Sequence, residues 1–161
     1  MTVKDKNQND IMSQELTKSF EIDYIFENKP INRFKNKPTI ENINSRLNDL
    51  KTRIENINNC ELKNNAKQVV FSDGNFESSV MIVGEGPGQK EDELGKPFVG
   101  DAGQLLNKML AAINIKRENI YITNLVNYRP PNNRKPESSE INRYSEFLRQ
   151  HISIIDPKIL I

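Results

Sequence analysis

Three short apolar runs, separated by two amphipathic stretches, constrain the fold of this 161-residue chain more than any other feature. The runs cover residues 79–83, 119–126 and 158–161. Between them, residues 101–113 and 137–153 carry apolar side chains at spacings of three and four, which is typical of helices. Short buried strands that alternate with helices predict a parallel sheet covered by helices. We therefore expect an α/β fold, with three α/β/α layers and a mostly parallel central sheet that is truncated at its C-terminal end.

The rest of the chain supplies fewer elements. Residues 39–58 have the spacing of an amphipathic helix, and residues 14–28 could form a short one. We expect a strand, or the edge of one, at 67–71, followed by a turn at 72–75. Three prolines exclude regular structure from 129–136.

The two helices next to the strands allow finer predictions. Asp101 is a plausible N-cap of the first helix. Its apolar residues should line one buried face; they are Leu105, Leu106, Met109, Leu110 and Ile113. The second helix contains His151, the single histidine of the sequence, which we interpret as a residue on the helix surface.

Composition indicates a location but no ligand. The formal net charge of +1 gives no hint of nucleic acid. The single cysteine, Cys60, excludes an intramolecular disulfide and fits a reducing compartment. No apolar run approaches the roughly 18 residues that span a bilayer, and the N-terminus lacks the apolar centre of a secretory signal. We therefore expect a cytoplasmic protein without a membrane partner.

Ligands of parallel sheets bind at the carboxyl ends of the strands, so the loops 84–100 and 124–136 are the candidate site. Gly84, Gly86 and Gly88 allow a sharp turn that approaches a ligand closely, although the same glycines suit a phosphate cradle or a plain tight turn. Phe98 is either a core residue or a stacking platform for a flat base.

The second loop leaves similar alternatives open. Asn124 ends a strand, and it is either a turn residue or a hydrogen-bonding partner of a ligand. Arg129, Arg134 and Lys135 either contact phosphates or belong to a solvated loop.

The continuous motif GEGPGQKEDELGKPFVGDAGQLL, residues 84–106, resembles the first signature of the iron–sulfur (family 4) type of uracil-DNA glycosylase. ITNLVNYRPPNNRKP, residues 122–136, resembles its second signature, and EIDYIFENKPINRF near the start is similar to an N-terminal extension of many members. The resemblance implies a polar N-terminal extension at 1–38 and a partial uracil-DNA glycosylase-like α/β domain at 39–161.

The resemblance also implies roles at the matching positions. Glu85, Gly86 and Pro87 would frame the uracil pocket and its attacking water, and Glu91 would add a second acid. Phe98 would stack on uracil, and Asn124 would hydrogen-bond its edge, since a carboxamide offers both a donor and an acceptor. A DNA-facing loop would contain the remaining candidates, which are Arg129, Asn133, Arg134 and Lys135.

The family binds a four-iron cluster through four cysteines, and here the sequence departs from the pattern. Cys60 matches one ligand, whereas Ile57, Tyr128 and Tyr144 stand at the other three positions. One thiolate cannot hold a cluster that needs four. We expect no cofactor, with Cys60 a remnant of a cluster ligand and the two tyrosines filling the vacated space.

The implied function is base excision repair, by hydrolysis of the N-glycosidic bond of uracil in DNA. The histidine signature that the family carries after the third strand has no counterpart up to Ile161. We therefore expect little excision by these 161 residues alone, unless a separate chain supplies that segment. A non-catalytic module that binds DNA or a repair partner, and a decayed gene product without function, are the alternatives.

Overall fold

A computed structural model describes residues 39–161, so the extension at 1–38 and the helix expected at 14–28 lie outside the described residues. The described part contains five α-helices: α2 (Ile40–Glu55), α3 (Glu61–Asn65), α4 (Gln89–Leu94), α5 (Asp101–Ala112) and α6 (Ser138–Ile155). Its four strands are β1 (Ser72–Gly74), β2 (Val80–Gly84), β3 (Tyr121–Asn124) and β4 (Ile159–Leu160). Two short 3-10 helices complete it: η1 (Arg117–Asn119) and η2 (Pro131–Asn133).

The four strands form one sheet in the order β1-β3-β2-β4. β2 runs parallel to both β3 and β4, with Met81 opposite Tyr121 and Val80 opposite Ile159. Only β1 is antiparallel, pairing with β3 at the opposite edge. The prediction of a mostly parallel sheet is therefore confirmed.

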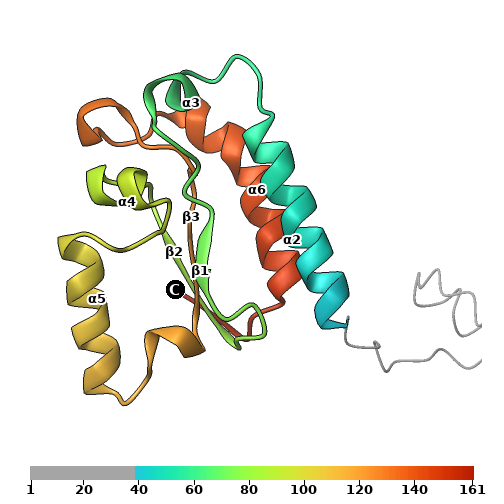
Figure 1. Cartoon of the computed structure of the whole chain (residues 1–161), viewed down its shortest axis with the longest axis vertical. Coiled ribbons are helices and arrows are strands. Elements are labelled where there is room, and N and C mark those ends of the chain that lie inside the picture. The colour runs from blue at the N-terminus through green and yellow to red at the C-terminus, as the bar shows by residue number, and fades with distance from the viewer. Residues whose placement is uncertain (1–38) are drawn as a thin grey trace, which may run out of the picture. The chain divides into compact units, whose positions relative to one another are not determined.

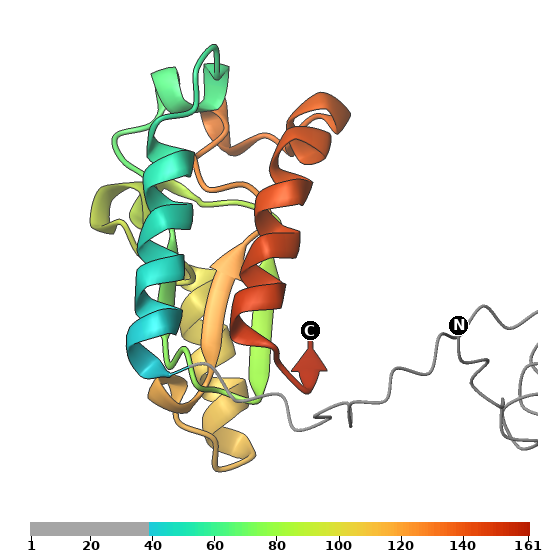
Figure 2. The same cartoon turned by 90° about the vertical axis from the view of Figure 1, so that its right-hand side faces the viewer.

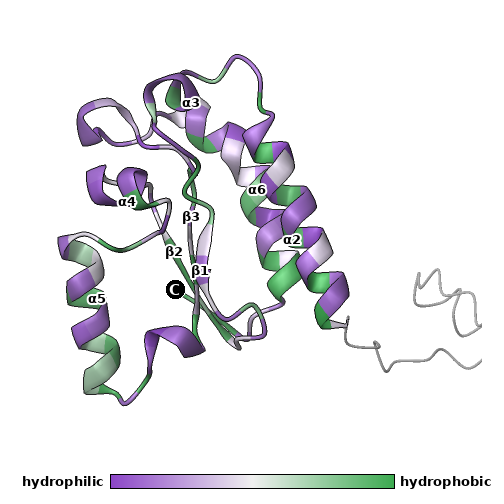
Figure 3. Cartoon of the chain, viewed as in Figure 1, coloured by the Kyte–Doolittle hydropathy of each residue, from purple (hydrophilic) through white to green (hydrophobic). Residues whose placement is uncertain are grey.

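Helices cover both faces of this sheet. α4 and α5 lie on one side in Figure 1, and α2 and α6 lie side by side across the other in Figure 2. Each face has its own apolar cluster, and β2 between them is among the most hydrophobic segments in Figure 3. The expected three layers are thus present. No helix within residues 39–161 is long and apolar enough to cross a membrane.

α2 follows the predicted pattern closely. Thr39 caps its N-terminus by accepting a hydrogen bond from the Asn42 N–H at 3.4 Å. Its buried residues recur at spacings of three and four and face α6 and the sheet; they are Ile43, Leu47, Leu50 and Ile54. Apolar burial, more than helix propensity, therefore holds α2 in place.

The region 67–75 differs from the prediction. No strand forms at 67–71, and three of the four residues expected in the turn form β1 instead. The Val70 N–H donates to the Asn127 carbonyl at 2.7 Å, and the Asn127 side chain donates to the Val70 carbonyl at 3.1 Å. A side-chain amide therefore replaces part of the ladder here, and regular pairing begins only at Ser72.

α5 forms where predicted but buries a narrower face. Leu105, Met109 and Ile113 are between 59% and 63% exposed. The helix turns Gly103, Leu106 and Leu110 toward the sheet, because a Cβ on Gly103 would lie 1.9 Å from the Phe98 carbonyl oxygen. This close approach sets the rotation of α5. The N-cap is Gly100, so Asp101 is the first residue of the helix instead of its cap.

The prediction that His151 lies on the surface is wrong. Its side chain is only 1% exposed, with Nε2 2.9 Å from the Tyr121 hydroxyl and the ring 4.5 Å from that of Phe71. It shares the sheet-facing side of α6 with Tyr144 and Ile154. Burial lowers the pKa of His151 to about 4, so the imidazole is neutral at pH 7.

We predict that His151 makes the fold sensitive to mild acid. The pKa of His151 in the folded chain lies below its unfolded value of about 6.5. Its contribution to the free energy of unfolding is therefore fully present above pH 6.5 and is lost as the pH falls toward 4. The full loss is on the order of 3 kcal/mol. Between pH 7 and pH 4.5, the free energy of unfolding measured in urea should fall by more in the unaltered chain than in His151→Gln. Equal losses in the two proteins would contradict this assignment.

Candidate active site

The candidate site begins where β2 and β3 end side by side. Gly84, the last residue of β2, lies opposite Asn124, the last residue of β3. Pairing continues into the loops, because the Leu125 N–H donates to the Gly84 carbonyl at 2.8 Å and the Val126 N–H donates to that of Glu85 at 3.2 Å. The two candidate loops therefore leave the sheet together, as the sequence predicts for a parallel sheet.

Asn124 and Phe98 approach each other beside Gly84 at this end of the sheet. A Cβ built on Gly84 would lie 2.3 Å from Asn124 Oδ1 and 2.7 Å from the Phe98 ring, so only glycine leaves room for both side chains. Asn124 is 3% exposed, yet its Nδ2 has no hydrogen-bond partner within the described part of the chain. A buried donor without a partner costs about 1–3 kcal/mol and requires an explanation.

The Phe98 ring has contacts on two sides. It is half-buried and packs against the apolar cluster beneath α5, which includes Ile82 and Leu110. Its ring atoms also approach the same point beside Gly84 as Asn124 Oδ1 does. Phe98 is therefore partly a core residue, and its ring also lies near the carboxamide of Asn124.

Glu91 connects the two halves of the first loop. Its carboxylate accepts hydrogen bonds from the N–H groups of Gly88 at 3.1 Å, Val99 at 2.8 Å and Gly100 at 2.6 Å. Burial works to raise the pKa of the Glu91 carboxyl, but these donors outweigh it and lower the pKa below its usual value. The ionised carboxylate thus holds the loop around Pro87 against the loop around Phe98.

Glu85, Gly86 and Pro87 line a small cavity of about 150 Å³ together with the second loop. The opposite wall consists of Pro130, Asn133, Arg134, Lys135 and Pro136. Glu85 is exposed at its rim. A Cβ on Gly86 would lie 2.8 Å from a methyl group of Val126, which gives a steric reason for glycine at this position.

The basic residues of the second loop lie near one another, but they differ in how firmly other side chains bind them. Arg134 forms two hydrogen bonds of 2.8 and 2.7 Å with the Glu140 carboxylate. The Arg129 Nε donates to Asn133 Oδ1 at 2.7 Å, and Lys135 is exposed. Paired guanidinium–carboxylate geometry of this kind fixes orientation, so Arg134 holds the loop to the start of α6.

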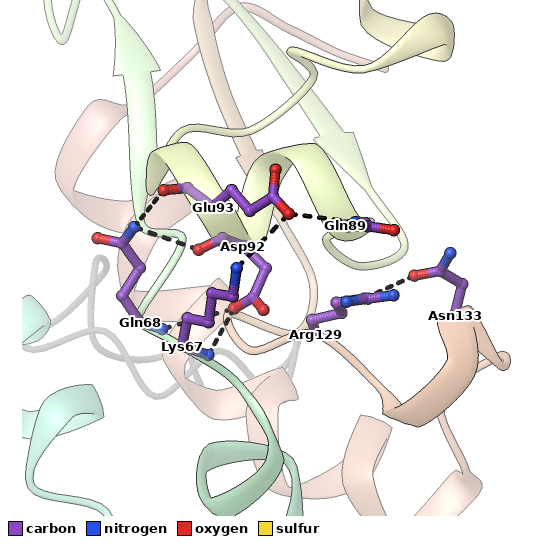
Figure 4. A network of polar contacts seen from close by, with 7 residues as sticks. All are labelled: Lys67, Gln68, Gln89, Asp92, Glu93, Arg129 and Asn133. Atoms are coloured by element: carbon purple, nitrogen blue, oxygen red, sulfur yellow. Dashed lines mark hydrogen bonds and ion pairs between the residues drawn. The ribbon is translucent and has the colours of Figure 1, made fainter.

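A polar network that sequence reasoning missed anchors α4 (Figure 4). The buried Asp92 accepts from the Lys67 N–H at 2.9 Å, and Gln68 Nε2 donates to the carbonyls of Asp92 and Glu93 at 3.2 and 2.9 Å. The Arg129–Asn133 pair lies beside the same helix in Figure 4. A buried acid within the motif was the one sequence signal, but its partners are backbone groups that no side-chain pattern reveals.

The positions of the four family cysteines form one buried cluster. Cys60 Sγ lies 3.3 Å from the Tyr144 hydroxyl, and Tyr128 and Ile57 pack in the same apolar core. Burial raises the pKa of Tyr128 to about 12. Residues 39–161 contain no group of three or more His, Cys, Asp or Glu side chains that could hold a metal ion. One thiol, two phenols and an isoleucine do not fit a cluster that requires four thiolates.

Comparison with known proteins agrees with this geometry. A family model described as "Uracil DNA glycosylase superfamily" matches residues 71–161, more than half of the chain. The match includes both loops and the sheet that carries them. The chain belongs to the uracil-DNA glycosylase superfamily.

Several curated relatives carry the name Type-4 uracil-DNA glycosylase. That of Thermotoga maritima is 43% identical over 109 residues, which are 68% of this chain and 57% of the relative. That of Pyrobaculum aerophilum is 44% identical over 115 residues, 71% of this chain and 59% of the relative. That of Saccharolobus solfataricus is 47% identical over 103 residues, 63% and 48% respectively. The matched part of the chain thus spans roughly half to three fifths of these relatives.

We predict that Glu91→Gln destabilises the fold. The variant retains an acceptor of similar shape, but a hydrogen bond to a charged acceptor contributes more than one to a neutral acceptor. The expected loss in the free energy of unfolding is about 1–2 kcal/mol, measured in urea at pH 7. Glu93→Gln, on an exposed residue of the same helix, is the matched control and should change it by less than about 0.5 kcal/mol. Equal effects would show that the three backbone contacts do not stabilise the loops.

Proposed function

We propose that this site binds uracil extruded from DNA, and that the chain serves the hydrolysis of its N-glycosidic bond in base excision repair. The observation that carries the proposal is the buried, unpartnered Nδ2 of Asn124 beside the Phe98 ring. A ligand with an acceptor opposite that atom would supply the missing hydrogen bond. Family membership and the Type-4 relatives support the same conclusion.

Uracil can form a hydrogen bond with each polar atom of the Asn124 carboxamide. Asn124 Nδ2 would donate to O4 of the base, and Oδ1 would accept from N3–H. Cytosine presents the reverse, with an amine at position 4 and an unprotonated N3, so it would leave two buried polar pairs mismatched. Phe98 would stack on the flat face of the base, as aromatic side chains do for extruded nucleotides.

The hydrolysis needs a water on the sugar side of the base. In that step the water oxygen bonds to C1′ and gives up a proton to the Glu85 carboxylate, the bond from C1′ to N1 breaks, and uracil leaves as an anion with the electron pair. We assign Glu85 to the water, because its exposed carboxylate stands at the rim of the cavity that Gly86 and Pro87 line. Donation from Asn124 to O4 would stabilise the departing anion.

Contacts to the DNA backbone fall to the second loop. Lys135 is exposed, and Arg129 and Asn133 stand close by as a hydrogen-bonded pair. These side chains can reach phosphates without breaking an ion pair, whereas Arg134 is engaged by Glu140. We therefore propose that Arg129 and Lys135 contact phosphate and that Arg134 acts by shaping the loop.

The edge strand β4 is a second surface to which we assign a partner. Ile159, Leu160 and Ile161 are each more than half exposed, while the strand pairs only with β2 among the described residues. An apolar edge of this kind favours pairing with a further strand. We propose that a strand of a separate chain pairs here.

Asn124→Asp tests recognition directly, because it keeps the shape of the side chain and removes the Nδ2 donor. The unaltered chain should bind a single-stranded oligonucleotide with one uracil more tightly than the same strand with cytosine. The variant should lose about tenfold to hundredfold of that preference, the effect of one unpaired buried group. Fluorescence anisotropy measures the affinities, and Asn48→Asp on the exposed face of α2 is the control. An unchanged preference would contradict the proposal.

Cleavage of the same uracil oligonucleotide after alkali measures excision in parallel. Asn124→Asp should reduce any excision by roughly a hundredfold or more. The assay also tests the expectation that these 161 residues by themselves excise little uracil.

We further propose that the chain holds no iron–sulfur cluster. The close packing of Cys60 against Tyr144, with Tyr128 in the same core, supports this proposal. The triple variant Ile57→Cys, Tyr128→Cys, Tyr144→Cys would restore the four thiols of the family pattern.

After anaerobic reconstitution, iron analysis and visible absorption should detect no cluster in the unaltered chain, and about four irons in the triple variant. Four irons in the unaltered chain would overturn the proposal. A double variant that leaves Tyr144 in place controls for nonspecific iron.

A further inference from the structure

Arg117 makes an unusual set of contacts for a residue outside both signatures. It belongs to η1, immediately before β3, and its guanidinium reaches back to the loop that carries Phe98. One terminal nitrogen donates to the Pro97 carbonyl at 2.7 Å, and the other donates to the Phe98 carbonyl at 2.9 Å. The guanidinium therefore donates hydrogen bonds to two consecutive carbonyl groups next to the ring.

Two further donors of Arg117 are held as well. Nε donates to Asp73 Oδ2 at 2.9 Å, and the nitrogen bound to Phe98 also donates to Asn107 Oδ1 at 3.2 Å. Asp73 lies on β1 and also faces the Lys96 ammonium at 3.7 Å. The Arg117 side chain is thus tied to β1, to α5 and to the loop at once, and only about a fifth of it is exposed.

The backbone of Phe98 needs such support. Its φ of +52° lies in the left-handed region, which costs a bulky residue of this type energy that the surroundings must offset. The adjacent carbonyl is enclosed by Arg117 on one side and by Gly103 of α5 on the other, where a Cβ would come within 1.9 Å of the oxygen. The direction of the Phe98 ring toward Asn124 depends on this backbone conformation.

We propose that Arg117 is a positioning residue that fixes the Phe98 ring in the orientation for stacking on uracil. The inference rests on the proposed function of the site and adds the residue that gives the stacking ring its geometry. Arg117 does not touch the base and acts only through Phe98. A lysine could not replace it, because one ammonium group cannot reproduce the planar fork that joins two carbonyls and a carboxylate.

The first test needs no ligand. In protein labelled with carbon-13 at phenylalanine, the Phe98 Cα shift reports the backbone conformation and its ring shifts report the ring environment. Arg117→Lys should move both sets of signals, whereas Arg149→Lys, on an exposed arginine of α6, should leave them in place. Unchanged Phe98 signals in Arg117→Lys would overturn the proposal.

The second test uses free uracil as the probe, titrated by NMR, in a double-mutant cycle. Phe98→Ala should weaken uracil binding by about tenfold or more, the usual effect of losing a stacking ring. Arg117→Lys should weaken it by a smaller factor, severalfold at least, and the double variant should be no weaker than Phe98→Ala alone. A merely structural role would instead give effects that multiply, and that result would overturn the proposal.

The two tests also separate this inference from the proposed function. If the unaltered chain bound no uracil, the proposed function would fail, while the Phe98 signals of the ligand-free chain would still decide whether Arg117 holds the ring. If the chain bound uracil but the variant effects multiplied, only the role of Arg117 would fail. Thermal unfolding of each variant excludes loss of the fold as the cause.

Discussion

The parallel pairing of β2 with β3 is the interaction on which the rest of the structure depends. It places Gly84 next to Asn124 and sends both following loops from the same edge of the sheet. The apolar side chains of these strands fill the cores on both faces, so a shift in register would disturb two packed layers as well as the site. Position of the loops and stability of the fold therefore have a common origin.

The loops themselves are secured by charged side chains that bind backbone groups. Glu91 accepts from three N–H groups, Arg117 donates to two carbonyls, and Asp92 accepts from the Lys67 N–H. A loop without regular structure must find partners for its buried polar groups, and these side chains provide them. Because each makes more than one hydrogen bond, these side chains fix the loops relative to the sheet.

The face of the sheet that α2 and α6 cover is stabilised by apolar packing. Around Cys60, where the related signature would place sulfur ligands, two buried phenols and an isoleucine join α2, α6 and the chain between them. Tyr144 is fully buried and still retains a polar neighbour in the cysteine thiol. Apolar packing thus connects segments distant in sequence, which is the task that a metal centre performs in many small domains.

Periodicity and motif by themselves determined much of this protein. The spacing of apolar residues predicted α2, α5, α6 and the three parallel strands, because the repeat of a helix or a strand is imposed by the local backbone. The continuous motif 84–106 placed Glu85, Glu91 and Phe98 in one segment between β2 and α5, although Glu91 lies on the short helix α4. Tertiary structure alone decided which way each element turns and which distant groups meet. The rotation of α5 follows from the contact of Gly103 with Phe98, and the burial of His151 follows from the packing of α6 against Tyr121. The hydrogen bond from Arg117 to the Phe98 carbonyl joins residues 19 positions apart. Because every residue has a backbone carbonyl, no sequence pattern predicts this contact.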